Sequence, residues 1–152
     1  MTFSHDSVAF LQGGDSSVGL KEGNVITLDQ AMHAMLLASA NEAAYAIGES
    51  VGVNAGHDYN WFIEQMNSRC KELGGENSNF ANTNGLHDPN HYTCARDMAL
   101  IGRELFKHPE FFPDCTDSQL YNSSQRDDGR TRFSIKSIKC FSRRIPIIIH
   151  IQ

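Results

Sequence analysis

Ser39 and Asn41 are the residues of this 152-residue chain whose types and spacing most suggest chemistry. They stand two positions apart, at the end of the apolar run Ala31–Ala40. In a regular helix, residues two apart point to nearly opposite sides, so this hydroxyl and carboxamide converge on one substrate only if the helix breaks between them. No Gly or Pro marks such a break. Propensity alone therefore predicts one helix from Leu28 to about Val51, with Ser-Ala-Asn as small buried residues.

A second pattern, Ser68-Arg69-Cys70-Lys71, has the S-x-x-K form of a serine nucleophile with a lysine base. A nucleophile needs a sheltered base and an oxyanion site beside it. Ser68 instead lies opposite the inward face of its predicted helix, toward water. That face is formed by Tyr59, Phe62, Ile63, Met66, Cys70 and Leu73. We interpret the match as accidental.

Histidines and cysteines offer little sign of a metal or cofactor. His87 and His91 are four positions apart, but Pro89 between them argues against a helical pair of ligands. No third ligand is evident, so both are interpreted as solvated loop residues. The four cysteines form no C-x-x-C, and Cys70 is predicted to be a small core residue. We expect no cofactor and no metal.

The sequence around Ser39-Ala40-Asn41 favours the interpretation of this tripeptide as a functional motif. The informative blocks are Gly19–Gly23, Leu36–Ala44, Met66-Asn67, Lys71–Gly74, Asn84–Thr93 and Ala95–Ala99. Together they resemble the D-alanyl-D-alanine carboxypeptidases, which are low-molecular-weight penicillin-binding proteins of serine peptidase family S11. The resemblance covers roughly Phe3 to Phe112, and it is specific as a whole although no single block proves it.

The resemblance implies a role for each matching residue. Ser39-Ala40-Asn41 is the S-x-N motif, the second of three in this class of acyl-enzymes. Ser39 is then the hydroxyl that relays a proton to the leaving D-alanine, and Asn41 holds the substrate amide. The motif further implies two helices that meet at it, contrary to the propensity reading. Asn84 lies near the active-site rim in this family, so the resemblance implies that it contacts substrate; a plain turn at Asn84-Gly85 explains the sequence equally well.

The other two motifs of the family have no match in the expected places. No S-x-x-K precedes Ser39, and Lys136-Ser137-Ile138 lacks the glycine of K-[ST]-G. We therefore expect an internal fragment, with a partial catalytic domain at 1–112 and a divergent or out-of-frame tail at 113–152. Without the nucleophile the chain alone should be inactive. The alternatives are a non-catalytic helical remnant or binding fragment, and a class A β-lactamase relative.

The expected fold class is α+β: the mainly helical portion of a β-lactamase/transpeptidase-like domain, with the central sheet largely missing. Thr27 and Gln30 form a capping box that starts the first long helix, predicted to be buried nearly all round. Further helices are predicted at about 41–51, at 58–73 and after a Thr93 cap. The inward face of this last helix is expected to consist of Ala95, Met98, Ala99, Gly102, Leu105 and Phe106.

Charge and composition limit the partners. A net charge of -5 argues against a nucleic-acid surface. The family works outside the cytoplasmic membrane, on peptidoglycan stem peptides and with β-lactams as ligands. Met1–Gly14 lacks the features of a secretory signal, so this chain by itself is expected to stay in the cytoplasm. The apolar stretch Ile145–Ile151 is too short to span a bilayer, so membrane contact is expected only through parts not seen here.

Overall fold

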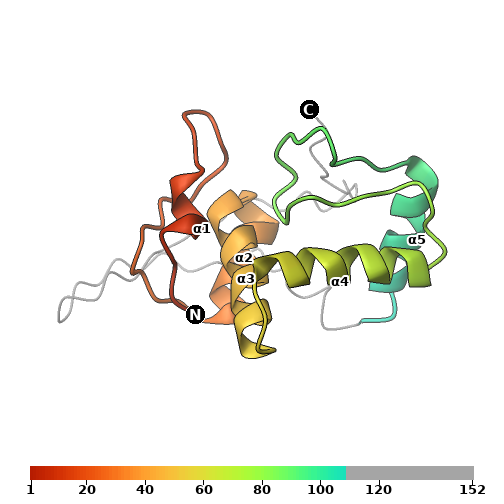
Figure 1. Ribbon diagram of the computed structural model, residues 1–152. Helices are drawn as coiled ribbons and strands as arrows, with labels where there is room; N and C mark the ends of the chain where they lie inside the picture. The colour runs from red at the N-terminus through yellow and green to blue at the C-terminus, as the bar shows by residue number, and fades with distance from the viewer. Residues whose placement is uncertain (109–152) are drawn as a thin grey trace.

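The computed structural model describes residues 1–108, which are mainly helical (Figure 1). The helices are α1 (Asp6–Ala9), α2 (Leu28–Ala38), α3 (Asn41–Asn54), α4 (Tyr59–Glu72) and α5 (Ala95–Leu105). Within 1–108, strand-type pairing is limited to two isolated antiparallel bridges, Thr2 with Val25 and Asn79 with Tyr92. The predicted domain boundary at 112, the Lys136-Ser137-Ile138 stretch and the Ile145–Ile151 stretch lie outside the described residues. No helix among residues 1–108 is long and apolar enough to cross a bilayer.

Helix starts follow local hydrogen-bonding chemistry. The predicted capping box of α2 is confirmed: Gln30 N donates to Thr27 Oγ1 at 3.1 Å, and Thr27 N donates to Gln30 Oε1 at 2.9 Å. Asp58 caps α4 by accepting from Trp61 N at 2.9 Å, as its place before the helix suggests. The cap of α5 is Cys94, so the prediction of Thr93 was wrong by one residue.

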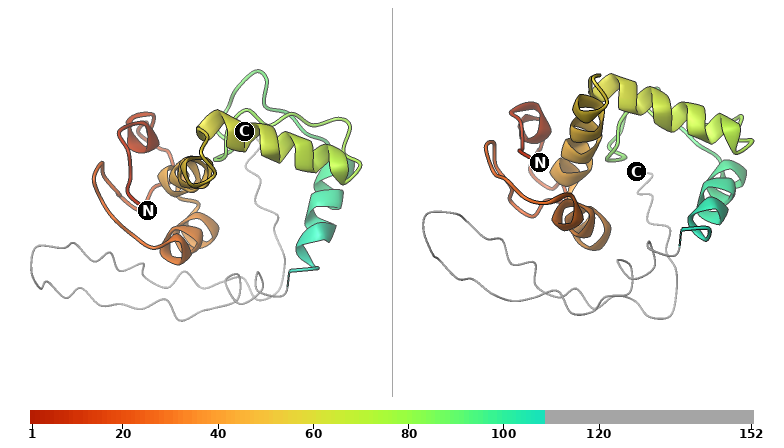
Figure 2. Two further views of the ribbon diagram at one scale, coloured as in Figure 1. Left: turned by 60° about the horizontal axis from the view of Figure 1, so that its bottom comes forward. Right: turned by 90° about the horizontal axis from the view of Figure 1, so that it is seen from below.

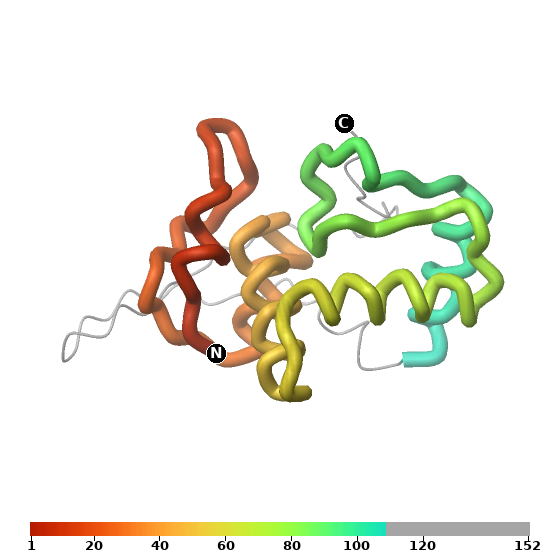
Figure 3. Tube along the Cα trace, in the orientation of Figure 1, coloured from red at the N-terminus to blue at the C-terminus, as the bar shows by residue number. Residues whose placement is uncertain are grey.

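The chain is arranged around α3, against which α1, α2 and α4 all pack. α2 lies alongside α3, and α4 leaves the end of α3 at a steep angle (Figures 1 and 2). α5 sits at the far end of α4. The segment 76–92 then folds back along α4 towards α3, as the tube in Figure 3 shows. This return path brings a loop distant in sequence next to the helix that carries the S-x-N motif.

Small residues form the contact between α2 and α3. Ala34, Ala40 and Ala43 make one buried cluster, with Val18 and Met35 packed against it. Alanines at these places let the helix backbones approach closely. The expectation that α2 is buried nearly all round was wrong, because only Ala31 and Ala34 of this helix are buried and Leu28 is 53% exposed. Its chief helical partner within 1–108 is α3, so the face away from α3 is only partly covered.

The orientation of α5 also differs from the prediction. Leu105 and Phe106 are 36% and 62% exposed, and the fully buried residue is Asp97. Its Oδ2 accepts hydrogen bonds from Asn77 N at 2.7 Å and from Ser78 Oγ at 2.9 Å. Burial alone raises the pKa of Asp97, but these donors outweigh it and hold the pKa below its ordinary value. The predicted apolar inward face of α5 is therefore wrong. The residue that this helix buries is the polar Asp97, whose hydrogen bonds tie the segment at 77–78 to α5.

Candidate functional site

Ser39 occupies the break between α2 and α3. Its φ and ψ are 53° and 35°, and it is the one non-glycine with positive φ among residues 1–108. Such a left-handed conformation costs a residue with a side chain about 1–2 kcal/mol. The N–H groups of Ser39 and Ala40 both point to the carbonyl of Ala34, which closes the end of α2. The structure thus confirms the two-helix reading and rejects the single helix that propensity favours.

Asn41 is the first residue of α3 and only 8% exposed. Its backbone N–H donates to the carbonyl of Ser16 at 3.0 Å. No hydrogen bond joins its side-chain amide to another residue within 1–108. Ser39, two residues before it, is exposed. The left-handed turn therefore separates the two residues onto different helices, with an exposed serine at the end of α2 and a largely buried asparagine at the start of α3.

Glu42 is the functional candidate that sequence reasoning missed. It is fully buried, and its Oε1 accepts from Ser17 Oγ at 2.7 Å and from Val18 N at 2.9 Å. Its Oε2 is buried and has no hydrogen-bond partner among the described residues. The sequence Glu42-Ala43-Ala44 does not by itself predict that the glutamate is buried. Its place in the first turn of a helix, where a negative charge is favoured, is the one available signal.

Asn84 lies in a tight turn of the returning loop. Asn82 Oδ1 accepts from Gly85 N at 2.7 Å, and Asn84 Oδ1 accepts from Leu86 N at 3.2 Å. Gly85 has a φ of 78°, so glycine suits this place. The structure therefore contains the turn at Asn84-Gly85, and the side-chain oxygen Oδ1 of Asn84 takes part in it.

The Asn84 turn rests against the helix that begins with Asn41. A Cβ built on Gly48 would lie 2.9 Å from the Thr83 methyl group, so the loop touches α3 at this glycine. Gly48 follows Asn41 by seven residues, about two helical turns, and the two share one side of α3. Thr83, the neighbour of Asn84, therefore lies on the same side of α3 as the S-x-N asparagine. No hydrogen bond joins Asn84 to Ser39 or Asn41 among residues 1–108.

Comparison with known proteins decides the family. The family model described as D-alanyl-D-alanine carboxypeptidase matches residues 1–128. The chain belongs to the D-alanyl-D-alanine carboxypeptidase family. A curated member, carboxypeptidase DacF of Bacillus subtilis, is 35% identical over 95 residues, which are 62% of this chain and 23% of that protein. This chain thus spans about a quarter of that relative.

Solved structures agree with the family assignment. The carboxypeptidase DacD of Francisella tularensis has a TM-score of 0.66 at 30% identity, over 78% of this chain and 27% of the other. Penicillin binding protein 5 of Haemophilus influenzae has a TM-score of 0.66 at 27% identity, over 77% and 33%. The described residues therefore have the fold of part of a penicillin-binding protein, and the resemblance to D-alanyl-D-alanine carboxypeptidases seen in the sequence is confirmed at the level of the family.

Within this carboxypeptidase-family chain, the second serine motif is not assembled as a site. Ser68 and Lys71 are both exposed on α4, while Ile63 and Cys70 of the same helix are 9% and 3% exposed. The inward face predicted for this helix is thus the buried one. Ser68 has no enclosed base beside it, which supports the interpretation of an accidental match.

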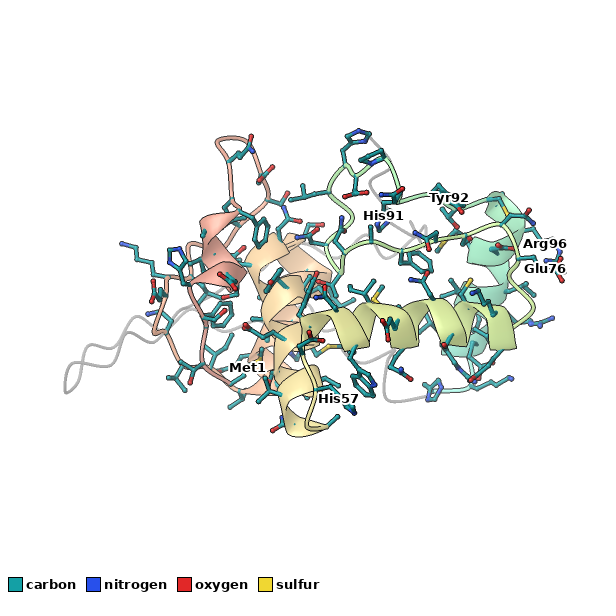
Figure 4. All side chains as sticks on the ribbon, in the orientation of Figure 1. Met1, His57, Glu76, His91, Tyr92 and Arg96 are labelled. Atoms are coloured by element: carbon teal, nitrogen blue, oxygen red, sulfur yellow. The ribbon has the colours of Figure 1, made fainter. Side chains whose placement is uncertain are left out.

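The two loop histidines have separate roles in the structure. His91 Nδ1 accepts the N–H of Ala81 at 3.2 Å, so this nitrogen carries no proton. Figure 4 shows His91 between the two arms of the loop and Tyr92 at its outer edge. Burial lowers the pKa of His91, and Asp88 partly opposes this by raising it. His87 is exposed. Among residues 1–108, no three His, Cys, Asp or Glu side chains gather as metal ligands.

Proposed function

We propose that the protein to which this chain contributes is a serine-type D-alanyl-D-alanine carboxypeptidase that acts on peptidoglycan stem peptides. Ser39 and Asn41 form the S-x-N wall of its active site. The observation that carries this proposal is the left-handed Ser39 between α2 and α3, because it lets both side chains serve one substrate. Backbone strain of this kind is retained mainly where function requires the geometry.

Each site residue has a defined part in the proposed reaction. A serine nucleophile from an S-x-x-K motif attacks the terminal peptide bond, and Ser39 passes a proton to the departing D-alanine. Asn41 holds the substrate amide through its carboxamide, which no residue within 1–108 engages. Asn84 contributes at the rim of the site. The proposed place of action is outside the cytoplasmic membrane, where peptidoglycan lies, and β-lactams are the expected inhibitors.

The chain by itself is proposed to be the mainly helical part of a β-lactamase/transpeptidase-like domain and not to form an acyl-enzyme. It contains no S-x-x-K before Ser39 and no K-[ST]-G. Members of a catalytic unit act together, so loss of the nucleophile removes most of the rate. Fluorescent penicillin should leave the purified chain unlabelled. A covalent adduct, mapped to Ser39 or Ser68, would contradict this.

A graft tests the function directly. Residues 3–108 replace the matching segment of Bacillus subtilis DacF, which supplies the remainder of the domain. The graft should release D-alanine from a stem-peptide analogue and bind fluorescent penicillin. In it, Ser39→Ala should lower kcat/KM by about 10²–10⁴-fold, the usual contribution of acid–base catalysis. Ser68→Ala is the matched control and should leave the rate unchanged. Equal rates for both variants would exclude the role given to Ser39.

A further inference from the structure

We infer that Glu42 is a positioning residue for the S-x-N motif, acting as a latch between the segment Ser16–Val18 and the first turn of α3. This inference rests on the proposed function, since it names what holds that site in place. Glu42 does not touch the substrate. It acts through the backbone on either side of Ser39 and Asn41.

The latch consists of contacts from the segment to two adjacent residues of α3. Ser17 Oγ and Val18 N donate to Glu42 Oε1 at 2.7 and 2.9 Å, while Asn41 N donates to Ser16 O at 3.0 Å. The segment is therefore held at the point where Ser39 turns the chain. Ser17 Oγ also accepts from Gly19 N at 2.9 Å, which orders the hydroxyl.

Packing shows why this attachment controls the motif. Val18 contacts the buried cluster of Ala34, Ala40 and Ala43, which lies on both sides of the Ser39 turn. Ala34 supplies the carbonyl that closes α2, and Ala40 lies between the two motif residues. Release of Val18 would loosen this cluster. The left-handed Ser39, which is costly on its own, would then be free to relax.

The latch requires a side-chain oxygen at residue 42 that accepts two hydrogen bonds. Oε2 has no hydrogen-bond partner among the described residues, so all the hydrogen bonding of the Glu42 side chain within 1–108 is directed at Ser17 and Val18. The first turn of a helix favours the negative charge, which offsets part of the cost of burial. Glutamine carries an oxygen at the same place and can accept both bonds, whereas alanine cannot.

Amide hydrogen exchange and side-chain NMR on the full 152-residue chain test the latch without any substrate. In Glu42→Ala, exchange of Val18 N–H and Asn41 N–H should quicken by about tenfold or more, and the Asn41 side-chain amide resonances should shift. Leu73 N–H, bonded within α4, should change by less than about twofold. Glu42→Gln should restore protection at Val18. Ser17→Ala, a milder change at an exposed residue, should give a smaller effect in the same places.

Glu49→Ala is the matched control, because it makes the same chemical change two turns further along α3 and should leave Val18 and Asn41 unaffected. Uniform acceleration across α3 and α4 in Glu42→Ala, absence of protection at Val18 in the unmodified chain, or failure of Glu42→Gln to restore it would each overturn the latch. An inactive graft with these local effects present would refute the proposed function and leave the latch intact.

Discussion

The hydroxyl of Tyr59, at the start of α4, accepts a hydrogen bond from the backbone N–H of Thr83 at 3.1 Å and lies 3.1 Å from the Thr83 hydroxyl. The Tyr59 ring is stacked on Tyr45 of α3, with centroids 4.0 Å apart. One side chain thus ties the loop that carries Asn84 to two helices. The orientation of the proposed site rim depends on this tie.

Removal of the Tyr59 hydroxyl should loosen that rim. Tyr59→Phe keeps the ring stack and deletes only the bonds to Thr83, so we expect a loss of about 0.5–1.5 kcal/mol in the free energy of unfolding. Urea denaturation measures this loss. Tyr92→Phe is the control, because Tyr92 is 57% exposed and should have little effect. Equal stability of both variants would mean that the Thr83 contact contributes nothing.

The backbone conformation of Ser39 predicts an unusual order of stability. At φ 53°, glycine is favoured over alanine, so Ser39→Gly should be more stable than Ser39→Ala by about 1 kcal/mol. Within a helix the order is reversed, because alanine stabilises a helix more than glycine does, by about 1 kcal/mol. Ser50 lies inside α3 and supplies the control pair of variants. Ser50→Ala should be more stable than Ser50→Gly. The same order at both positions would show that the helix runs through residue 39.

The turn between α3 and α4 should not tolerate a side chain at Gly52. A Cβ there would collide with the backbone carbonyl of Asp58, which cannot rotate away as a side chain can. We expect Gly52→Ala to lower the free energy of unfolding by about 1–3 kcal/mol, despite the better helix propensity of alanine. Gly13→Ala, where a Cβ meets nothing within 4 Å, is the control. A thermal melt that ranks Gly52→Ala at or above the unmodified chain would show that the turn rearranges freely.

Protonation of His91 should weaken the loop under acid conditions. The pKa of His91 in the folded chain lies below the ordinary 6.5, so the unfolded chain binds the proton more readily. The stability that neutral His91 contributes is therefore complete above about pH 6.5 and is lost as the pH falls through its folded pKa. Denaturation midpoints at a series of pH values measure this loss.

Substitutions at the two histidines separate this effect from general acid sensitivity. His91→Asn offers an oxygen to Ala81 N–H in place of Nδ1 and should remove the His91 part of the pH dependence. His87→Asn alters an exposed residue of the same loop and should retain it. An unchanged pH profile in His91→Asn would show that the Ala81 contact does not carry the effect.

Local sequence patterns predicted most of the helices. The features that they did not predict depend on hydrogen bonds between residues distant in the sequence. The Thr27–Gln30 box and the Asp58 cap are short-range chemistry, and both hold in the structure. Asp97 and Glu42 are buried with hydrogen-bond donors that lie 19–20 and 24–25 positions away in the sequence, which no periodicity reveals. The break at Ser39 carries no Gly or Pro, so only resemblance to a known motif predicted it. The roles of Ser39, Asn41 and Asn84 in catalysis stay predictions.

The packing of α1, α2 and α4 around one common helix has a consequence for how changes spread through the chain. The latch at Glu42 and the loop contact at Gly48 lie on the same 14-residue rod. Because one continuous helix carries both attachments, the spacing between the Ser39 turn and the loop that carries Asn84 depends on no intervening loop. Glu42 and Tyr59 share no hydrogen-bond partner, so we expect Glu42→Ala and Tyr59→Phe to be nearly additive in a double-mutant cycle.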